Sequence, residues 1–345
     1  MHWHVEAIDP AALDDAFLTA HHRLAAAAMA ADRPYEPPLT RRGADEWLRA
    51  ASSTARRFLL WGVRDDSELV GAVRLSLPGY ENSDHAQIEL RVDPARWRQG
   101  AGTALLRVAL AAASAEERQT VSAWLTKDTP AAALATRLGM RVTSTMLIQR
   151  LDWATADRSR WQQPTPPGYH AAQWISPAPQ ALIANFAEAK TAMHGVPFGG
   201  VSYRLPEWTV ERVRAAEAEL TARGIKQWVV VAAHQATGEI AGLTELQFRD
   251  ERPGIGLQMD TSVRPNHRGH RLGLFVKSQM LHWLDSGDIS SLDGIQTSVA
   301  PHNPHMLRIN EALGFTVART AQLMEGDVQQ LMSQLAVGVS PNGSK

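Results

Sequence analysis

Polar and apolar residues follow the same order of patterns in two halves of the chain. Each half opens on a short strand pattern and continues into helical stretches. An apolar strand, a pair of strands and a helix with apolar residues at helical spacing come next. The predicted strands cover residues 3–8, 58–63, 69–77 and 86–92 in the first half and 169–175, 227–232, 240–248 and 255–263 in the second. The predicted helices include residues 11–31 and 209–223.

An internal repeat relates the two halves. Gly71 in SELVGAVRLSL corresponds to Gly242 in GEIAGLTELQF, and this offset of 171 residues continues without an insertion into the following loop. A slip of one residue would turn every side chain of a strand to the other face, so matched spacing predicts matched strands. The offset is kept by Gln87 and Gln258, Glu89 and Asp260, Val92 and Val263, Pro94 and Pro265, and Gly102 and Gly273. We therefore expect an α/β protein of two tandem domains, each a mixed, mostly antiparallel sheet flanked by helices.

The domain limits follow from composition. Residues 154–168, ATADRSRWQQPTPPG, are polar and carry three prolines, which disfavour both a helix and a sheet ladder. This segment is predicted to be a linker between an N-terminal domain at 1–153 and a C-terminal domain at 169–337. Residues 338–345 are predicted to form a flexible tail.

Composition narrows the class of protein. The 345 residues are 44% hydrophobic and 21% charged, with 35 basic and 36 acidic side chains. A net charge near zero gives no global field to attract nucleic acid or an anionic membrane. The absence of cysteine excludes disulfides, thiolate metal sites and a cysteine nucleophile. No apolar run reaches 18 residues and no HExxH spacing occurs, so we expect a soluble, cytoplasmic protein without a membrane span or a metal.

The candidate chemistry lies where the last paired strand of the second half leads into a helix. The loop reads Val263-Arg-Pro-Asn-His-Arg268-Gly-His-Arg271-Leu-Gly273. A helix start offers free backbone N–H groups and a positive dipole end, which suit a pyrophosphate. Its arginines add local charge, although an ordinary basic loop capping a helix has the same composition.

The strand before this loop carries polar residues at alternate positions. Gln258, Asp260 and Ser262 are predicted to point to one face of the strand. A central strand usually carries apolar residues on both faces, so a polar face indicates the lining of a cleft. An edge strand with one wet face is the alternative.

At this junction the sequence resembles the GNAT acyltransferase superfamily, whose phosphate-binding motif is Gln/Arg-x-x-Gly-x-Gly/Ala. The second half supplies Arg268-Gly-His-Arg271-Leu-Gly273 and the first supplies Trp97-Arg-Gln-Gly100-Ala-Gly102, so each departs from the motif at one position. The later signature Asn-x-x-Ala, then Tyr, then Gly-Phe appears in part as Asn303, Met306, Asn310 and Gly314-Phe315. The first half has lost the asparagine. The chain is thus similar to tandem GNAT proteins of actinobacteria, a group that includes mycothiol synthase-like enzymes.

The resemblance implies an acyl transfer from acetyl-CoA, or another short acyl-CoA, to an amine by direct attack in a ternary complex. It implies that the strand at 255–263 binds the pantetheine arm and that the Val263 amide serves as oxyanion donor. The loop and the helix start would hold the pyrophosphate. The cofactor-binding residues expected on this basis are Met259, Thr261, Val263, Arg268, Gly269, His270, Arg271, Leu272, Gly273 and Asn303.

An attacking amine is protonated at neutral pH and needs a base. Asp260 is our first candidate because it lies on the predicted polar face, and Glu245 on the neighbouring strand is the second. Asn310 stands where the family has its proton-donating tyrosine, yet an amide cannot supply a proton at neutral pH. Tyr203 is the alternative acid. A further loop, Met193–Gly200, is expected to cover the substrate.

These residues favour the C-terminal domain as the catalytic one and the N-terminal domain as degenerate. We expect a small-molecule amine as substrate, and a monomer or a homodimer. Two other interpretations stay open: a non-catalytic, acyl-CoA-binding scaffold, and a protein in which both domains are active.

Overall fold

The chain was analysed as a computed structural model, which describes residues 3–34, 36–49, 52, 56–191, 200–249, 252–287 and 292–337. It forms two compact units, and both are discontinuous in sequence. The first comprises Met1–Thr145, Gly199–Arg204 and Ala321–Lys345, and the second comprises Met146–Phe198 and Leu205–Thr320. The predicted tail lies outside the described residues.

Two long strands each run from one unit into the other. Strand β6 (Arg141–Asp152) runs from the first unit into the second, and β12 (Thr316–Asp327) runs from the second into the first. The predicted domains at 1–153 and 169–337 are contiguous, and the compact units are not. The predicted linker at 154–168 belongs wholly to the second unit and contains the short helix η3 (Arg158–Trp161).

The first unit has the strand order β1-β2-β3-β4-β5-β12. All neighbours whose register is described are antiparallel except β4 and β5. The strands are β1 (Val5–Ala7), β2 (Arg56–Asp65), β3 (Glu68–Pro78), β4 (His85–Val92) and β5 (Thr120–Thr126).

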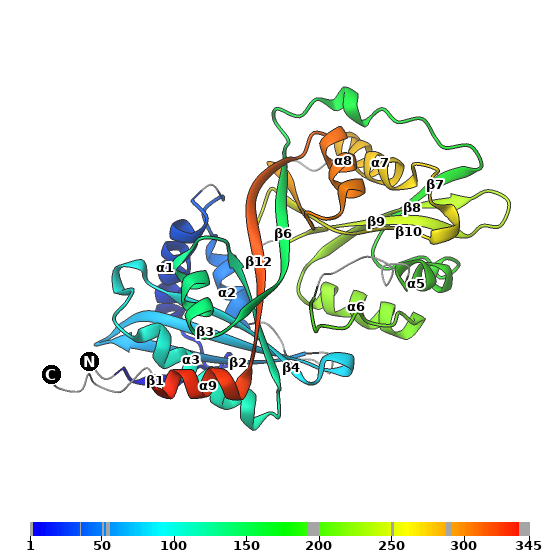
Figure 1. Cartoon of the computed structure of the whole chain (residues 1–345). Coiled ribbons are helices and arrows are strands. Elements are labelled where there is room, and N and C mark those ends of the chain that lie inside the picture. The colour runs from blue at the N-terminus through cyan, green and yellow to red at the C-terminus, as the bar shows by residue number, and fades with distance from the viewer. Residues whose placement is uncertain are drawn as a thin grey trace. The chain divides into compact units, whose positions relative to one another are not determined.

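Helices cover both faces of this sheet because its strands are apolar on both sides (Figure 1). One buried cluster joins the sheet to α1 (Asp15–Asp32) and α2 (Arg41–Arg49). The opposite cluster joins it to α3 (Ala101–Ala115) and α9 (Val328–Val337). Helix α4 (Pro130–Arg137) follows β5.

The second unit repeats this plan with the strand order β6-β11-β10-β9-β8-β7. Its parallel pair is β10 and β11, in the same place as β4 and β5. The strands are β7 (Tyr169–Ile175), β8 (Lys226–His234), β9 (Ile240–Phe248), β10 (Ile255–Val263) and β11 (Gly294–Val299). The predicted strand pair at 240–248 and 255–263 is confirmed, and so is the mixed α/β fold.

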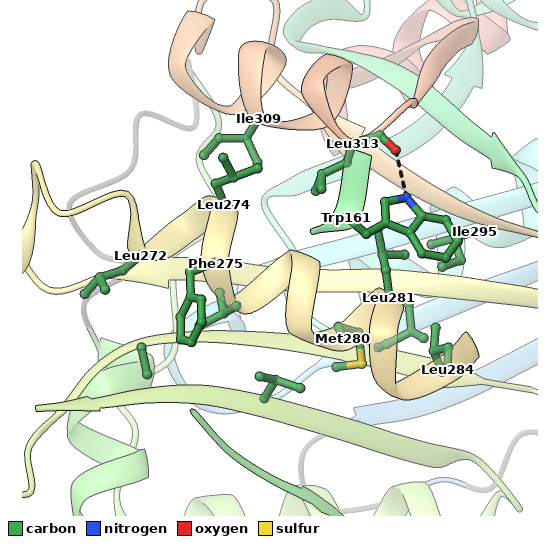
Figure 2. Packing of buried hydrophobic residues seen from close by; sticks show 14 of the residues in the cluster. Trp161, Leu272, Leu274, Phe275, Met280, Leu281, Leu284, Ile295, Ile309 and Leu313 are labelled. Atoms are coloured by element: carbon green, nitrogen blue, oxygen red, sulfur yellow. Dashed lines mark hydrogen bonds between the residues drawn. The ribbon is translucent and has the colours of Figure 1, made fainter. Parts of the chain in front are cut away.

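Two apolar clusters hold the second unit together. Helices α5 (Ile183–Thr191) and α6 (Val210–Ala222) cover one face, and α7 (Leu272–Ser286) covers the other, beside α8 (Pro304–Ala312). Figure 2 shows Trp161 among the residues of the α7 cluster. Its side chain is fully buried and Nε1 donates to the Leu313 carbonyl oxygen at 3.2 Å. The predicted linker therefore contains one buried anchor residue, Trp161, that its polar composition did not indicate.

Replacing this anchor tests its contribution. We expect Trp161→Ala to lower the free energy of unfolding of the second unit by about 3–5 kcal/mol, because it removes a fully buried aromatic side chain. Chemical denaturation followed by fluorescence measures the loss. Trp124→Ala, at a residue that is 44% exposed, serves as control and should cost less than about 1 kcal/mol. Equal losses for the two variants would show that the segment does not anchor the unit.

Candidate active site

One extra residue in β10 shapes the centre of the second unit. Gln258 pairs with Leu246 of β9 and Thr261 pairs with Thr244, so three steps along β10 match two steps along β9. Such a bulge bends the strand and leaves residues outside the ladder. Here it sets Met259 and Asp260 opposite Glu245.

Beyond this level β10 and β11 separate. Their parallel pairing is described from Ile255 with Gly294 to Leu257 with Gln296. Strand β11 then stays paired with β6 up to Val299, and β10 stays paired with β9 up to Val263. Because the Arg264 amide donates to the Ala241 carbonyl oxygen of β9, the preceding amide of Val263 points to the side of β10 that β11 has left.

The loop after β10 uses two residues in the left-handed backbone region. Gly269 has φ 86° and Arg271, the N-cap of α7, has φ 60°. No side chain of the described residues caps this helix start, so its first amides keep their donors. Arg268, Gly269, His270 and Arg271 are exposed, whereas Leu272 and Gly273 are buried against the unit. An anion at this position would meet N–H groups, the positive helix end and arginine side chains.

The base of this loop is held by a chain of hydrogen bonds. Tyr169 Oη lies 2.9 Å from His267 Nδ1, and His267 Nε2 lies 3.1 Å from Glu239 Oε2. Arg264 Nη1 donates to the other oxygen of Glu239 at 2.8 Å. The His267 hydrogen bond, against the cost of burial, and the Arg264 charge hold the pKa of Glu239 below its ordinary value. The loop therefore starts from a fixed position.

A buried ion pair lies on the α5 face of the sheet beside the bulge. Lys190 Nζ of α5 donates to Glu245 Oε1 at 2.7 Å and Oε2 at 2.8 Å, and both side chains are buried. Gln227 Nε2 donates to the same carboxylate at 3.2 Å. The ammonium also lies 4.4 Å from the centroid of the Trp208 ring. Both carboxylate oxygens of Glu245 therefore accept hydrogen bonds within the cluster.

Asp260 completes this cluster from the bulge. Its side chain is 43% exposed, and Oδ2 lies 3.9 Å from Lys190 Nζ. Burial raises the pKa of Glu245 above its ordinary value, the attraction of Lys190 opposes the rise, and the negative charge of Asp260 adds to it. Of the two carboxylates, Asp260 is the one exposed to solvent.

A second polar cluster is buried on the opposite face. Lys277 Nζ of α7 donates to Asn310 Oδ1 of α8 at 2.7 Å, and Asn310 Nδ2 donates to Gln149 Oε1 of β6 at 2.7 Å. All three side chains are buried. Burial lowers the pKa of Lys277 to about 7. Asn303 lies at the start of the same helix, where Oδ1 accepts from the Met306 amide at 3.1 Å.

In the first unit, the residue that corresponds to Asp260 is bonded by neighbouring side chains of the same unit. Strand β4 pairs with β3 without a register shift from Gly71–Val92 to Ser76–Gln87. Glu89, the counterpart of Asp260, accepts from Arg74 Nε at 3.1 Å and from Trp47 Nε1 at 2.9 Å. Although burial opposes it, the Arg74 charge holds the pKa of Glu89 below its ordinary value.

The loop of the first unit is likewise bonded internally. Trp97 Nε1 donates to the Val92 carbonyl oxygen at 3.0 Å, and Trp3 Nε1 donates to that of Gln99 at 2.7 Å. Its backbone has the same left-handed pair, at Arg98 (φ 62°) and Gly100 (φ 96°). The two loops thus share one conformation and carry the glycine at opposite positions of the pair.

Comparison with known proteins identifies this arrangement. The sequence profile described as "Acetyltransferase (GNAT) family" matches residues 24–140. A tandem GNAT protein from the clavulanic acid biosynthesis pathway shares 26% identity and superposes with a TM-score of 0.79, over 95% of this chain and 99% of that one. Residues 24–140 thus form a GNAT acetyltransferase domain, and the whole chain is similar to a tandem GNAT protein.

The matches to curated relatives extend across both units of this chain. The mycothiol acetyltransferase of Nocardia farcinica is 29% identical over 269 residues, covering 76% of this chain and 80% of the relative. That of Mycobacteroides abscessus is 26% identical over 279 residues, covering 80% and 86%. The family profile matches the first unit, which keeps the Gly100-x-Gly102 spacing, whereas the open carboxylate and the bulge belong to the second. Glu89, the counterpart of Asp260 in the first unit, is bonded by Arg74 and Trp47.

The structure separates several residues that the sequence grouped. Gln258 does not share a side with Asp260, because the bulge interrupts the alternation and turns its amide to Thr244 Oγ1, at 2.8 Å. Tyr203 belongs to the first unit, where its ring stands edge-on to His85. Asn310 is buried and is bonded to Lys277 and Gln149. The expected substrate-covering loop, Met193–Gly200, lies outside the described residues except for Gly200.

The remaining predicted binding residues lie along β10. Met259 in the bulge is exposed, and Thr261 shares a hydrogen bond of 2.7 Å with Thr244. Two functional candidates were missed in the sequence, Lys190 and Lys277. Both lie in helices with ordinary amphipathic patterns, and only their burial marks them. Within the described part of the chain, no three His, Asp or Glu side chains are grouped to hold a metal ion.

The buried pair is testable through stability. We expect Glu245→Gln to lower the free energy of unfolding by about 3 kcal/mol, because it leaves the Lys190 charge buried without its main partner. Urea denaturation at neutral pH measures this. Glu311→Gln, on the exposed side of α8, is the control and should change stability by less than about 0.5 kcal/mol. A neutral effect of Glu245→Gln would contradict a stabilising role for the Lys190–Glu245 pair.

Proposed function

We propose that the second unit transfers the acetyl group of acetyl-CoA to a primary amine of a small molecule by direct attack in a ternary complex. The observation that carries the proposal is the bulge in β10, which brings an accessible carboxylate next to the point where β10 and β11 separate. A reacting thioester and an amine would meet there. The GNAT acetyltransferase match at residues 24–140 and the similarity to a tandem GNAT protein support acetyl transfer, and the acceptor and the ternary mechanism are our inference.

Acetyl-CoA binding is supported by the loop and by the strand edge. The uncapped start of α7 and the exposed Arg268 and Arg271 suit the diphosphate. The side of β10 that lacks a partner beyond Leu257 offers backbone groups to the amides of the pantetheine arm. The Val263 amide, directed to that side, would donate to the developing oxyanion.

Asp260 would act as the base for the amine. An alkylammonium has a pKa of about 10 and must lose a proton before it attacks. Asp260 is exposed and close to a cluster that already holds one ammonium group, that of Lys190. Glu245 cannot fill this role while Lys190 and Gln227 occupy its oxygens. The Lys190–Glu245 pair would instead fix the electrostatic surroundings of Asp260.

The first unit would serve as a degenerate partner. Its carboxylate, Glu89, is bonded by Arg74 and Trp47. We therefore expect one acetyl-CoA site in each chain. Because the relatives carry the name mycothiol acetyltransferase, amine precursors of mycothiol belong in the acceptor panel beside amino sugars and simple amines.

Replacing the proposed base separates chemistry from binding. We expect Asp260→Asn to lower kcat for acetyl transfer by about 100-fold or more, because the amine loses its proton acceptor. The affinity for acetyl-CoA, measured by calorimetry, should stay unchanged. Asp128→Asn at an exposed position of the first unit is the control. An Asp260→Asn variant with native kcat would refute the role of this carboxylate.

Calorimetry also counts the sites. We expect one acetyl-CoA per chain, and Arg268→Ala should weaken binding about 10-fold or more, since a charge-assisted contact to a phosphate contributes about 1.5–3 kcal/mol. Arg98→Ala changes the corresponding loop of the first unit and should leave the affinity unchanged. A stoichiometry of two would restore the first unit as an active domain, and acetyl-CoA binding without transfer to any amine would support a scaffold.

A further inference from the structure

Lys277 is the buried charge that the proposed mechanism does not use. It lies in the middle of α7 and is 2% exposed. Its ammonium donates to Asn310 Oδ1 and lies 5.0 Å from the centroid of the Phe315 ring. No carboxylate of the described residues forms an ion pair with it. A lysine in these surroundings costs stability that an apolar side chain of similar length would not.

The internal repeat shows that the fold does not need a lysine here. Helices α3 and α7 have equal lengths and align from Ala101 with Leu272, so Leu106 is the counterpart of Lys277. Leu106 packs against the apolar core of the first unit. Ala135 precedes Gly139 by four residues, as Asn310 precedes Gly314, so Ala135 is the counterpart of Asn310. Ala135 is buried too. The unit with the open carboxylate is therefore also the one that carries the buried lysine and its amide partner.

The Lys277 cluster lies at the level where the parallel strands separate. Asn310 Nδ2 donates to Gln149, and Gln149 of β6 stands opposite Thr297 of β11. Thr297 follows Gln296, which is the last residue of β11 with a described partner in β10. The hydrogen-bonded chain from α7 through α8 thus meets the sheet one residue beyond the last β10–β11 pair.

We propose that Lys277, held by Asn310, is the proton donor to the thiolate that leaves when the acetyl group is transferred. This inference rests on the proposed function of the second unit. Asn310 acts as a positioning residue, because its amide fixes the ammonium and supplies no proton itself.

The proton balance is simple. The amine nitrogen attacks the thioester carbonyl carbon, a C–N bond forms, and the proton of the amine passes to Asp260 directly or through water. The C–S bond then breaks, its electron pair goes to sulfur, and sulfur takes a proton from the Lys277 ammonium. The products are the amide and the free thiol; Asp260 then releases its proton to solvent, and Lys277 takes one up after the thiol has left.

The energetics favour this direction of transfer. A thiol of ordinary pKa, about 8.5, is a weaker acid than an ammonium whose pKa burial has lowered to about 7. An ordinary lysine, with a pKa of about 10.4, would donate against the gradient. The groups that face Lys277 are the amide of Asn310 and the ring of Phe315. No charged group from α8, β6 or the other described elements around α7 contributes to the shift, whose cause is burial.

The experiment compares Lys277→Met and Lys277→Gln with the native full-length protein. Methionine fills the volume, and glutamine also keeps a donor for Asn310, but neither gives a proton. We expect native kcat to decline above about pH 7, as Lys277 loses its proton. Both variants should lose about 100-fold in kcat and should no longer show this alkaline decline. The KM for acetyl-CoA should stay within about twofold.

A leaving-group test shows whether the lost step is protonation. A selenoester analogue of acetyl-CoA leaves as a selenolate, which needs a proton less than a thiolate does. We expect the penalty of both variants to shrink to less than about tenfold with this substrate. Lys226→Met on β8, an exposed lysine, is the control and should behave as the native protein does with either substrate.

Thermal unfolding gives a readout that needs no activity. In the unfolded chain Lys277 keeps its proton up to about pH 10.4, and in the folded protein it loses the proton above about pH 7. The unfolded state then binds more protons, so Lys277 makes the native protein more stable as pH rises through this window. Lys277→Met should lack this rise and melt higher than the native protein at pH 6.

The outcomes are separable. Native kcat and a retained alkaline decline in Lys277→Gln would overturn the proton-donor role, and so would an equal loss with thioester and selenoester. If no amine is acetylated by the native protein while the melting data show the lowered Lys277 pKa, the proposed function of the unit fails. Loss of activity in Asp260→Asn together with a native pH profile in Lys277→Gln would leave the proposed function standing and remove only this inference.

Discussion

The single extra residue in β10 is the constraint on which the rest of the second unit depends. A regular ladder would carry β10 alongside β9 with strict alternation, as β4 follows β3 in the first unit. The bulge ends that alternation, turns Asp260 toward Lys190, and bends the strand at the level where β11 continues with β6 instead. The position of the proposed base thus depends on one register shift, whereas the open strand edge is common to both units, because β4 and β5 also separate after three described pairs.

Duplication has produced two loops with one backbone and different side chains. Both place residues in the left-handed region at the same two positions, and each uses an arginine at one of them and a glycine at the other. A side chain in this region costs about 1 kcal/mol or more, so each loop carries the strain once. The difference lies in what surrounds the loop. Trp3 bonds to the first loop and Trp97 bonds back to β4, and the first loop exposes Arg98 where the second exposes both Arg268 and Arg271.

Buried charge distinguishes the units further. The second unit keeps Lys190 with Glu245 on one face of its sheet and Lys277 with Asn310 on the other. Each costs free energy of desolvation, and the apolar Leu106 in the first unit shows that at least one of these positions tolerates an apolar residue. Groups that lower stability and flank the same strand opening are better explained by chemistry at that opening than by the needs of folding.

The sequence alone determined the first four strands of each half, the repeat at an offset of 171 residues and the loop before α7, because these depend on local periodicity and spacing, but it did not indicate β5, β6, β11 or β12. It could not show that 146–152 and 321–327 change units, that Trp161 anchors the second one, or that Tyr203 belongs to the first. Nor could it show the bulge or the partners of Glu245 and Asn310. Those features are contacts between residues far apart in the chain. Only the packing of whole elements decides which side chains are buried together and which carboxylate is left open.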